Sequence, residues 1–168
     1  IAHELLSPET NLGQQVLHSF GPEILQDGKI SRRKLAEKVF QNPQQLEALE
    51  RLLHPAVLKK IEERYEQACK TDRYTSFVVE IPLLYEIGAE DNYDVVVAVL
   101  ADEQIARKRF EQAGFQSNEY ERRMSRQLQP ALKAKRAHYT LTNNGSLEQL
   151  RQEVVKLNSI LHKETHHS

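Results

Sequence analysis

Apolar residues in the first part of the chain recur at the spacing of an α-helix. Ser7-Pro8 has the pattern of a helix start, and the apolar positions that follow continue until Gly21. Asp27-Gly28 indicates a turn, and a further amphipathic helix is predicted over 31–40. The first part of the chain is therefore expected to consist of short helices joined by a tight turn.

The helix that follows is predicted to be interrupted. Asn42 with Gln45 three residues later has the pattern of a capping box at a helix start. Pro55 has no backbone N–H, and its ring clashes with the preceding helical turn. We therefore predict a break or kink at His54-Pro55, followed by a second amphipathic helix over 57–68.

The apolar pattern changes period in the middle of the chain. A short apolar run ended by Pro82 predicts a buried strand over 76–81, and a valine-rich run predicts a second strand over 93–100. A third strand is predicted over 139–142. Long helical segments separate these strands, and parallel neighbours need connections of that length. The fold class is therefore predicted to be α/β, with a parallel sheet and flanking helices.

Helices are predicted between and after the last two strands. Their expected ranges are 102–113, 118–128 and 130–136. A final helix begins after a capping box formed by Ser146 and Gln149, and the tail over 163–168 is expected to be disordered.

The chain has 168 residues, and its charges nearly cancel, at 23 Lys+Arg against 24 Asp+Glu. This length predicts one domain over 1–168. Residues 104–136 hold nine Lys or Arg and three Glu, a local charge of 9 − 3 = +6. A basic helical insertion in a neutral protein favours a small anionic ligand over a nucleic acid, although a solvated helix face is the alternative. We interpret 104–136 as a candidate lid on a core of 1–103 and 137–163.

Cysteine usage and hydropathy limit the possible environments. Cys69 is the only cysteine, which excludes an internal disulfide and the common zinc frameworks. No run approaches about 20 apolar residues, and Ile1 does not begin a signal peptide. We therefore expect a cytoplasmic protein with no membrane partner and no structural metal, and the oligomeric state stays open.

Chemistry is expected where the parallel strands end, because open α/β sheets bind ligands beyond the carboxyl ends of their strands. The segments at these ends are 82–86, with a proline and a carboxylate, Gln104 to Arg109, with a guanidinium suited to phosphate, and the polar turn 143–145. Taken singly, these segments also fit a proline-terminated strand, an exposed helix face and a loop before a capped helix.

Together, these residues resemble the dephospho-CoA kinase family of P-loop kinases. The resemblance extends from Ile1 to about Leu157. The pieces that carry it, in order, are Ile1-Ala2-His3, Leu53-His54-Pro55, Pro82-Leu83-Leu84-Tyr85-Glu86, Gln104 with Arg107, Gln127 and Asn143-Asn144-Gly145.

This resemblance implies transfer of a phosphoryl group from ATP, with its Mg²⁺, to the ribose 3′-hydroxyl of dephospho-CoA, which gives coenzyme A in the last step of its biosynthesis. It implies that Arg107 is a lid arginine that contacts phosphate, and that Asn143 and Gly145 border adenine. The residues that it places beside dephospho-CoA are His54, Pro82, Leu83 and Glu86.

The chain also departs from the family pattern. No G-x-x-x-x-G-K-[ST] string, whose backbone amides and lysine hold the phosphates, occurs in the sequence. The catalytic base, an aspartate in this family, is expected just upstream of Ile1. We therefore expect that the N-terminal segment with the P-loop and its strands is absent from this chain, and that the chain as given is inactive. Smaller departures are Ser31, Glu111 and His138.

Two other functions remain open at this stage. Another P-loop kinase, for example one acting on a nucleoside monophosphate, would share the fold and lid, and the pair formed by His54-Pro55 and 82–86 counts against it. A non-catalytic α/β binding module would bind ligands without turnover. An assay of ADP release separates these classes.

Overall fold

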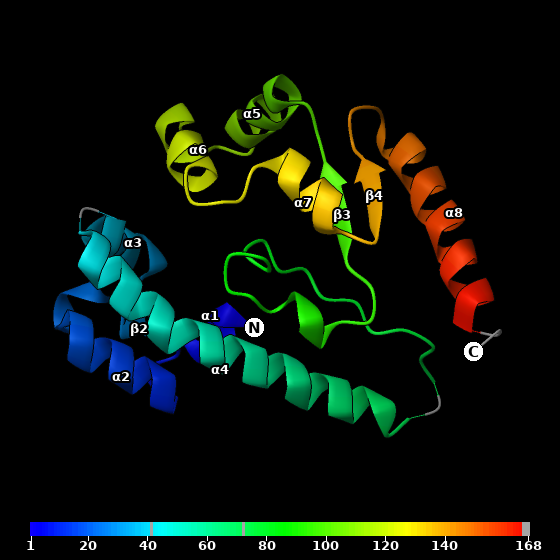
Figure 1. The fold of residues 1–168 in the computed structure, drawn as a ribbon. Helices are drawn as coiled ribbons and strands as arrows, with labels where there is room; N and C mark the ends of the chain where they lie inside the picture. Colours follow the sequence, from blue (N-terminus) through cyan, green and yellow to red (C-terminus); the bar gives the residue numbers. More distant parts are fainter. Residues whose placement is uncertain (41, 72, 166–168) are drawn as a thin grey trace. The chain divides into compact units, whose positions relative to one another are not determined.

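A computed structural model describes residues 1–40, 42–71 and 73–165 of the chain (Figure 1). The contacts divide the chain into two units, Ile1–Glu80 and Ile81–Ser168. The predicted single domain, with its core and its lid over 104–136, stays a prediction.

The first unit is mainly helical. Its elements are α1 (Ala2–Leu5), α2 (Asn11–Phe20), the 3-10 helix η1 (Pro22–Ile24), β1 (Leu25–Gln26), β2 (Lys29–Ile30), α3 (Arg32–Phe40) and α4 (Pro43–Cys69). The long helix α4 packs against α1, α2 and α3. The three shorter helices of this unit therefore share α4 as a common neighbour.

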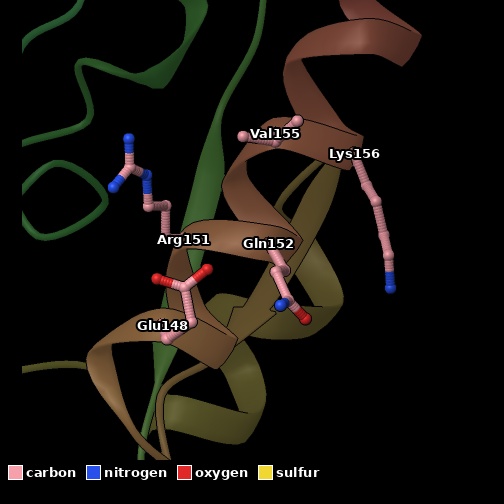
Figure 2. A pocket seen from close by; sticks show the side chains of 5 residues that line it. All are labelled: Glu148, Arg151, Gln152, Val155 and Lys156. Atoms are coloured by element: carbon pink, nitrogen blue, oxygen red, sulfur yellow. The ribbon is translucent and has the colours of Figure 1, made fainter.

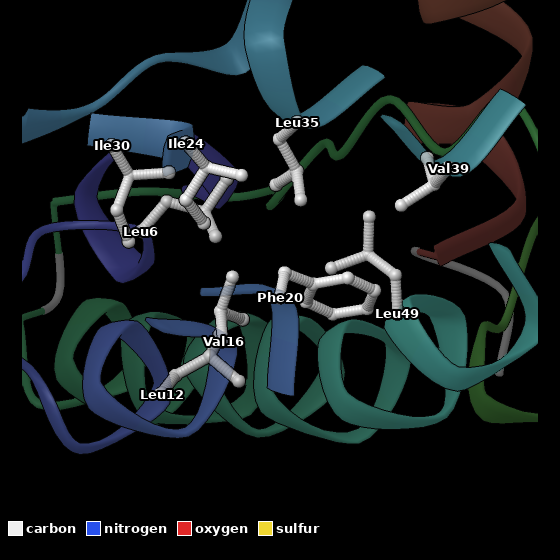
Figure 3. Packing of buried hydrophobic residues seen from close by; sticks show 9 residues of the cluster. All are labelled: Leu6, Leu12, Val16, Phe20, Ile24, Ile30, Leu35, Val39 and Leu49. Carbon is white, nitrogen blue, oxygen red and sulfur yellow. The ribbon is translucent and has the colours of Figure 1, made fainter. Parts of the chain in front are cut away.

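A cluster of aliphatic and aromatic side chains fills the space between these elements (Figure 3). Val16, Ile24 and Val39 are its largest fully buried side chains. The other members are Leu6, Leu12, Phe20, Ile30, Leu35 and Leu49. Because α2, η1, β2, α3 and α4 each supply at least one member, and Leu6 directly follows α1, burial of this cluster holds the first unit together.

Helix α2 begins three residues later than predicted. Thr10, not Ser7, is the N-cap, and its hydroxyl oxygen accepts a hydrogen bond from Gly13 N at 2.9 Å. The same hydroxyl lies 2.8 Å from the carbonyl oxygen of Ser7. The predicted start at Ser7-Pro8 is therefore wrong, because Thr10 can bond to both sides of the helix start. The predicted end is confirmed, since Gly21 follows the last residue with a φ of 80°.

The turn at Asp27-Gly28 is confirmed. Both residues have positive φ angles, 51° and 74°, and they join the antiparallel strands β1 and β2. A two-residue hairpin turn of this kind needs positive φ at both positions, which Asp and Gly tolerate. The flanking strands contain two residues each, too few to give a period in the sequence.

Helix α4 runs through Pro55 as one helix, so the predicted break is wrong, while a kink at this position stays a prediction. The predicted start is confirmed, because Asn42 Oδ1 accepts hydrogen bonds from Gln44 N at 3.0 Å and Gln45 N at 3.3 Å. Pro55 removes one intrahelical hydrogen bond, the one that Arg51 O would accept. Packing of the flanking turns against α1, α2 and α3 offsets that loss.

A Gly13→Ala substitution is expected to destabilise the protein, although this change ordinarily stabilises a helix by about 1 kcal/mol. The new Cβ would lie 1.9 Å from Ser7 O and 2.7 Å from Ser7 C, so the backbone before α2 must move. We expect a loss of about 1–3 kcal/mol in the free energy of unfolding, measured by urea titration. The control Ser19→Ala, on the exposed side of α2, should change it by less than about 0.5 kcal/mol. A stabilised Gly13→Ala protein would contradict this packing.

The second unit contains a small parallel sheet with helices around it. Its elements are the 3-10 helix η2 (Glu90–Asn92), β3 (Val97–Leu100), α5 (Glu103–Gln112), α6 (Ser117–Met124), α7 (Pro130–Arg136), β4 (Tyr139–Thr142) and α8 (Leu147–Thr165). Strands β3 and β4 pair in parallel, with Val97 opposite Tyr139 and Leu100 opposite Thr142. Helix α7 packs against β3 and α8 against β4. The predicted α/β class with a parallel sheet is confirmed.

Only one of the three predicted strands has its expected bounds. The strand over 139–142 is confirmed, whereas the strand over 93–100 is shortened to Val97–Leu100, the length that β4 can pair. The predicted strand over 76–81 is wrong, and Val78 in that segment is 88% exposed. An apolar run becomes a strand only when a neighbour accepts and donates its backbone hydrogen bonds, and no described segment pairs with this one.

The predicted helices of the second unit are mostly confirmed. The predictions over 102–113 and 130–136 match α5 and α7, and the capping box is formed by Ser146 N with Gln149 Oε1 at 2.8 Å and Gln149 N with Ser146 Oγ at 3.2 Å. The prediction over 118–128 is shifted, since α6 ends at Met124. Helix α8 continues to Thr165, so the predicted disorder is wrong for 163–165, and 166–168 lie outside the described residues.

Candidate active site

The two parallel strands end at the same edge of the sheet, and the polar turn after β4 begins there. Asn143 N donates a hydrogen bond to Leu100 O at 2.7 Å, which joins the ends of β3 and β4. The side chain of Asn143 is half-buried, and no hydrogen bond to its amide forms within the part of the chain that the structure describes. An amide carries both a donor and an acceptor, so this side chain can bind a polar ligand edge.

We call residues 143–145 the base loop, and several hydrogen bonds fix its backbone. Asp102 N donates to Asn144 Oδ1 at 2.8 Å. The Arg109 guanidinium donates to Asn143 O at 2.6 Å and to Gly145 O at 3.0 Å. The predicted residues Asn143 and Gly145 are therefore brought together at the sheet edge by groups that lie on and before α5.

Arg107, the predicted phosphate-binding arginine, lies on α5 between two carboxylates. Its guanidinium is 3.1 Å from Glu103 Oε1 and is also paired with Glu121 of α6, and it lies over the Tyr120 ring, 4.9 Å from the ring centre. Hydrogen bonds to Glu121 and then to Glu103 raise the pKa of Arg107. The arginine is thus a permanent cation held in one orientation, and an incoming phosphate would compete with these carboxylates for it.

A cavity of about 270 Å³ lies among the helices that hold Arg107. Its polar lining includes both carboxylate partners of Arg107 and the resemblance residue Gln127. The full lining is Ala101, Glu103, Tyr120, Glu121, Met124, Gln127, Gln129 and Pro130. The cavity opens beside the end of β3, where a ligand of a parallel sheet is expected.

We call residues 82–86 the acceptor segment, and Lys133 of α7 joins it to the basic stretch 104–136. The Lys133 ammonium group lies 2.7 Å from Pro82 O, 2.9 Å from Glu86 Oε1 and 3.2 Å from Gln127 Oε1. Leu128 N also donates to Glu86 Oε1. The side chains of Lys133 and Glu86 are 17% and 18% exposed, although Glu86 as a whole residue is exposed. Of the predicted acceptor residues, Pro82 and Glu86 are therefore fixed by one cation, and Leu83 lies half-buried between them.

Burial of the Glu86 carboxylate by itself raises its pKa, but the hydrogen bonds from Leu128 N and Lys133 outweigh burial and lower it. A lowered folded-state pKa means that the ionised carboxylate stabilises the fold above the ordinary glutamate pKa of about 4.3. That contribution is lost as the pH falls through the folded-state pKa.

A Glu86→Gln protein is therefore expected to melt at a lower temperature than the parent at pH 7, with the difference shrinking toward pH 3. The glutamine retains an acceptor for Leu128 N but loses the charge that faces Lys133. The measurement is the melting temperature across this pH range. Glu148→Gln, on the exposed surface of α8, is the matched control and should show no such trend. A difference independent of pH would contradict the ionic role of Glu86.

A second basic residue of α7 packs over the acceptor segment. The Arg136 guanidinium lies over the Tyr85 ring, 4.5 Å from the ring centre, and pairs with Glu90. Burial raises the pKa of Tyr85, so its phenol stays neutral. The Tyr85 hydroxyl and Glu90 Oε2 are buried without a hydrogen-bond partner among the described residues. Lys133 in the middle of α7 and Arg136 at its last residue thus both hold this part of the chain.

His54 lies in the first unit, on α4, where it is half-buried. It precedes Pro55, whose missing N–H leaves Arg51 O without its helical donor. The role of His54 beside the acceptor stays a prediction. No group of three or more His, Cys, Asp or Glu side chains that could hold a metal ion occurs among the described residues.

A surface hollow of about 330 Å³ lies along α8 (Figure 2). Figure 2 shows that one helix supplies all its lining side chains, namely Glu148, Arg151, Gln152, Val155 and Lys156. None of the residues predicted from the sequence lines it. The smaller cavity beside Arg107 is therefore the better candidate for a ligand site.

Sequence reasoning missed two residues that organise the site. Arg109 and Lys133 were counted in the basic stretch 104–136, but no separate role was predicted for either residue. The partners of Arg109 are 34 and 36 residues away, and Pro82 is 51 residues from Lys133. Only the local charge excess signalled them.

A parallel sheet with a polar loop at its carboxyl edge, next to basic helices, is an α/β arrangement of the kind found in P-loop kinases. Structural comparison agrees, since the crystal structure of a Thermus thermophilus protein superposes with a TM-score of 0.70 at 32% identity and covers 92% of this chain and 78% of that one. A dephospho-CoA kinase from Campylobacter jejuni gives a TM-score of 0.67 at 28% identity, over 98% of this chain and 82% of that one.

The chain belongs to the dephospho-CoA kinase family, whose family model matches residues 1–149. A dephospho-CoA kinase from Protochlamydia amoebophila is 41% identical over 159 residues, which cover 94% of this chain and 78% of the relative. A second, from Chlamydia muridarum, is 38% identical over 155 residues, or 92% of this chain and 77% of the relative. Among the described residues, we find no helix whose length and apolar character would let it cross a membrane.

Proposed function

We propose that this chain forms the lid, the base loop and the acceptor segment of an ATP-dependent dephospho-CoA kinase. The reaction is phosphorylation of the ribose 3′-hydroxyl of dephospho-CoA, which gives coenzyme A. The observation that carries the proposal is that Arg107, Asn143 and Glu86 belong to one structural unit. Asn143 lies at the carboxyl ends of β3 and β4, and Lys133 joins Glu86 to Gln127 of the cavity lining. Family membership over residues 1–149 supports the same activity.

The geometry supports a division of roles within this unit. Asn143 and Gly145 of the base loop would border adenine, with the half-buried amide of Asn143 facing the base. Arg107 would leave its carboxylate partners for the transferring phosphate, whose charge a planar guanidinium matches in two hydrogen bonds. Pro82, Leu83 and Glu86 would line the side that takes dephospho-CoA, and the role of His54 toward this substrate stays a prediction.

The chemistry requires positioning and charge neutralisation more than covalent participation by the protein. The 3′-oxygen forms a bond to the γ-phosphorus while the bond from that phosphorus to the bridging oxygen of ADP breaks. The hydroxyl proton passes to a base, which the resemblance places in a segment outside the present chain. The residues described here bind and orient, and the lid shields the reacting phosphate from water.

Several finer expectations belong to the same proposal. Mg²⁺ would arrive with the nucleotide and keep several of its waters, since it dehydrates reluctantly. The protein would act in the cytoplasm on small molecules, without a nucleic-acid partner.

The test is an assay of the full-length enzyme, with its P-loop, supplied with ATP, Mg²⁺ and dephospho-CoA. We expect ADP release together with a product heavier than dephospho-CoA by one phosphoryl group. Adenosine monophosphate and other nucleoside monophosphates serve as alternative acceptors. Faster turnover of a nucleoside monophosphate than of dephospho-CoA would replace this proposal with the other kinase activity.

A further inference from the structure

Arg109 holds both ends of the base loop. Its guanidinium donates one hydrogen bond to the carbonyl oxygen of Asn143 at 2.6 Å and another to that of Gly145 at 3.0 Å. The two terminal nitrogens of the guanidinium, Nη1 and Nη2, therefore bind backbone carbonyl oxygens on either side of Asn144. A charged planar group that bridges two carbonyls restricts the loop more than two independent bonds would.

Arg109 differs in this respect from Arg107, although both lie on α5. Residues two apart on a helix point about 200° away from each other. Arg107 faces the carboxylates of Glu103 and Glu121, where a phosphate can replace them. The half-buried Arg109 faces uncharged carbonyls of the base loop, and its Nη1 and Nη2 atoms donate hydrogen bonds to them.

A second, independent bond fixes the middle of the same loop. Asn144 Oδ1 accepts from Asp102 N at 2.8 Å, so the side chain of Asn144 is tied to the residue before α5. With Asn143 N bound to Leu100 O, every residue of the loop has a fixed hydrogen bond. The half-buried Asn143 amide is thus presented from a backbone that has little freedom to rotate.

We propose that Arg109 is a positioning residue that sets the preference of the enzyme for adenine over guanine nucleotides. This inference rests on the proposed function, in which the base loop borders adenine. Adenine presents an amino donor where guanine presents a carbonyl acceptor. A base loop whose amide and backbone are fixed can therefore form hydrogen bonds with adenine, while the hydrogen-bonding groups of guanine are left without partners. A loop released from Arg109 can rotate to satisfy either base, and it binds adenine less well because it must first be ordered.

The experiment compares the full-length enzyme with its Arg109→Met variant, which retains the aliphatic stem and loses the fork. We expect KM for ATP to rise about tenfold, KM for GTP to change by less than about twofold, and selectivity for ATP to fall about tenfold as a result. The KM for dephospho-CoA and kcat should stay within about twofold of the parent. Lys108→Met, which removes a neighbouring exposed charge from the same helix, is the matched control and should leave the ratio unchanged.

A second variant guards against a folding defect in the first. Asn144→Ala removes the bond from Asp102 N and should lower the same ATP-to-GTP ratio. Because both substitutions loosen one loop, the double variant should lose less selectivity than the product of the two single effects. If Arg109→Met does not fold, the selectivity of Asn144→Ala for ATP over GTP tests the inference in its place.

Nucleotide binding without acceptor, measured by calorimetry with ATP and with GTP, separates this inference from the proposed function. A protein that fails to phosphorylate dephospho-CoA but loses its preference for ATP on Arg109→Met disproves the activity and supports the positioning role. Two results would overturn the inference. One is an equal loss of affinity for ATP and for GTP, and the other is a fall in kcat with the KM values for both nucleotides unchanged. Either would show that Arg109 acts on phosphate or on general stability.

Discussion

A polypeptide that consists of residues 1–168 alone is expected to release no ADP from ATP in the presence of dephospho-CoA. The sequence contains no G-x-x-x-x-G-K-[ST] string, so no cradle of backbone amides and no P-loop lysine hold the β- and γ-phosphates. Arg107 would be left as the principal charge on the transferring group, and the loss of preorganised phosphate contacts costs several orders of magnitude in rate. The measurement is the rate of ADP release, monitored with a coupled enzymatic assay.

The control is the same chain within a longer polypeptide that carries the phosphate-binding loop. It should turn over at rates typical of kinases, about 1–100 per second. Turnover by residues 1–168 alone at a comparable rate would show that another part of the chain binds the phosphates. The expected loss of ADP release would then be wrong, and the proposed role of residues 104–136 as a lid over phosphates held by a P-loop would have to be revised.

An Arg107→Lys substitution in the full-length enzyme is expected to lower kcat about 100-fold. Lysine keeps the charge but not the planar fork that gives two hydrogen bonds to phosphate oxygens. The melting temperature should stay nearly the same, because the carboxylate partners Glu103 and Glu121 are on the surface and exposed ion pairs contribute little to stability. Steady-state kinetics and a thermal melt of both proteins provide the comparison.

Arg122→Lys is the matched control, since Arg122 is an exposed arginine of α6 in the same basic stretch. Its kinetics should equal those of the parent. If Arg107→Lys also behaved like the parent, Arg107 would be an ordinary surface residue held by two glutamates, and phosphate binding by the lid would have to be sought among its other cations.

Local patterns predicted the helices better than the strands. Asn42 and Ser146 begin helices as expected because a cap depends only on residues within one turn. Pro55 misled because its cost depends on the packing of the turns beside it, which the sequence does not display locally. The strand expected over 76–81 failed for a related reason, since pairing requires a partner that periodicity cannot reveal.

The candidate site was only partly accessible from the sequence. Arg107 and Asn143 could be predicted because each follows a strand end and matches a family motif. The position of Arg109 could not, because its partners are carbonyl oxygens, which every residue possesses and no motif marks. Lys133 is similar, as one of its partners is Pro82 O. A side chain whose partners are backbone atoms cannot be recognised from the pattern of side chains in the sequence.

The three bonds of Lys133 have a consequence for substrate binding. This one ammonium group joins Gln127, which lines the lid cavity, to Pro82 and Glu86 of the acceptor segment. A nucleotide that shifts α7 must therefore either carry the acceptor segment with it or break these bonds. Under the proposed function, these bonds would link the two substrate affinities through Lys133. Such linkage is reciprocal: whatever factor the nucleotide imposes on the affinity for the acceptor, the acceptor would impose on the affinity for the nucleotide.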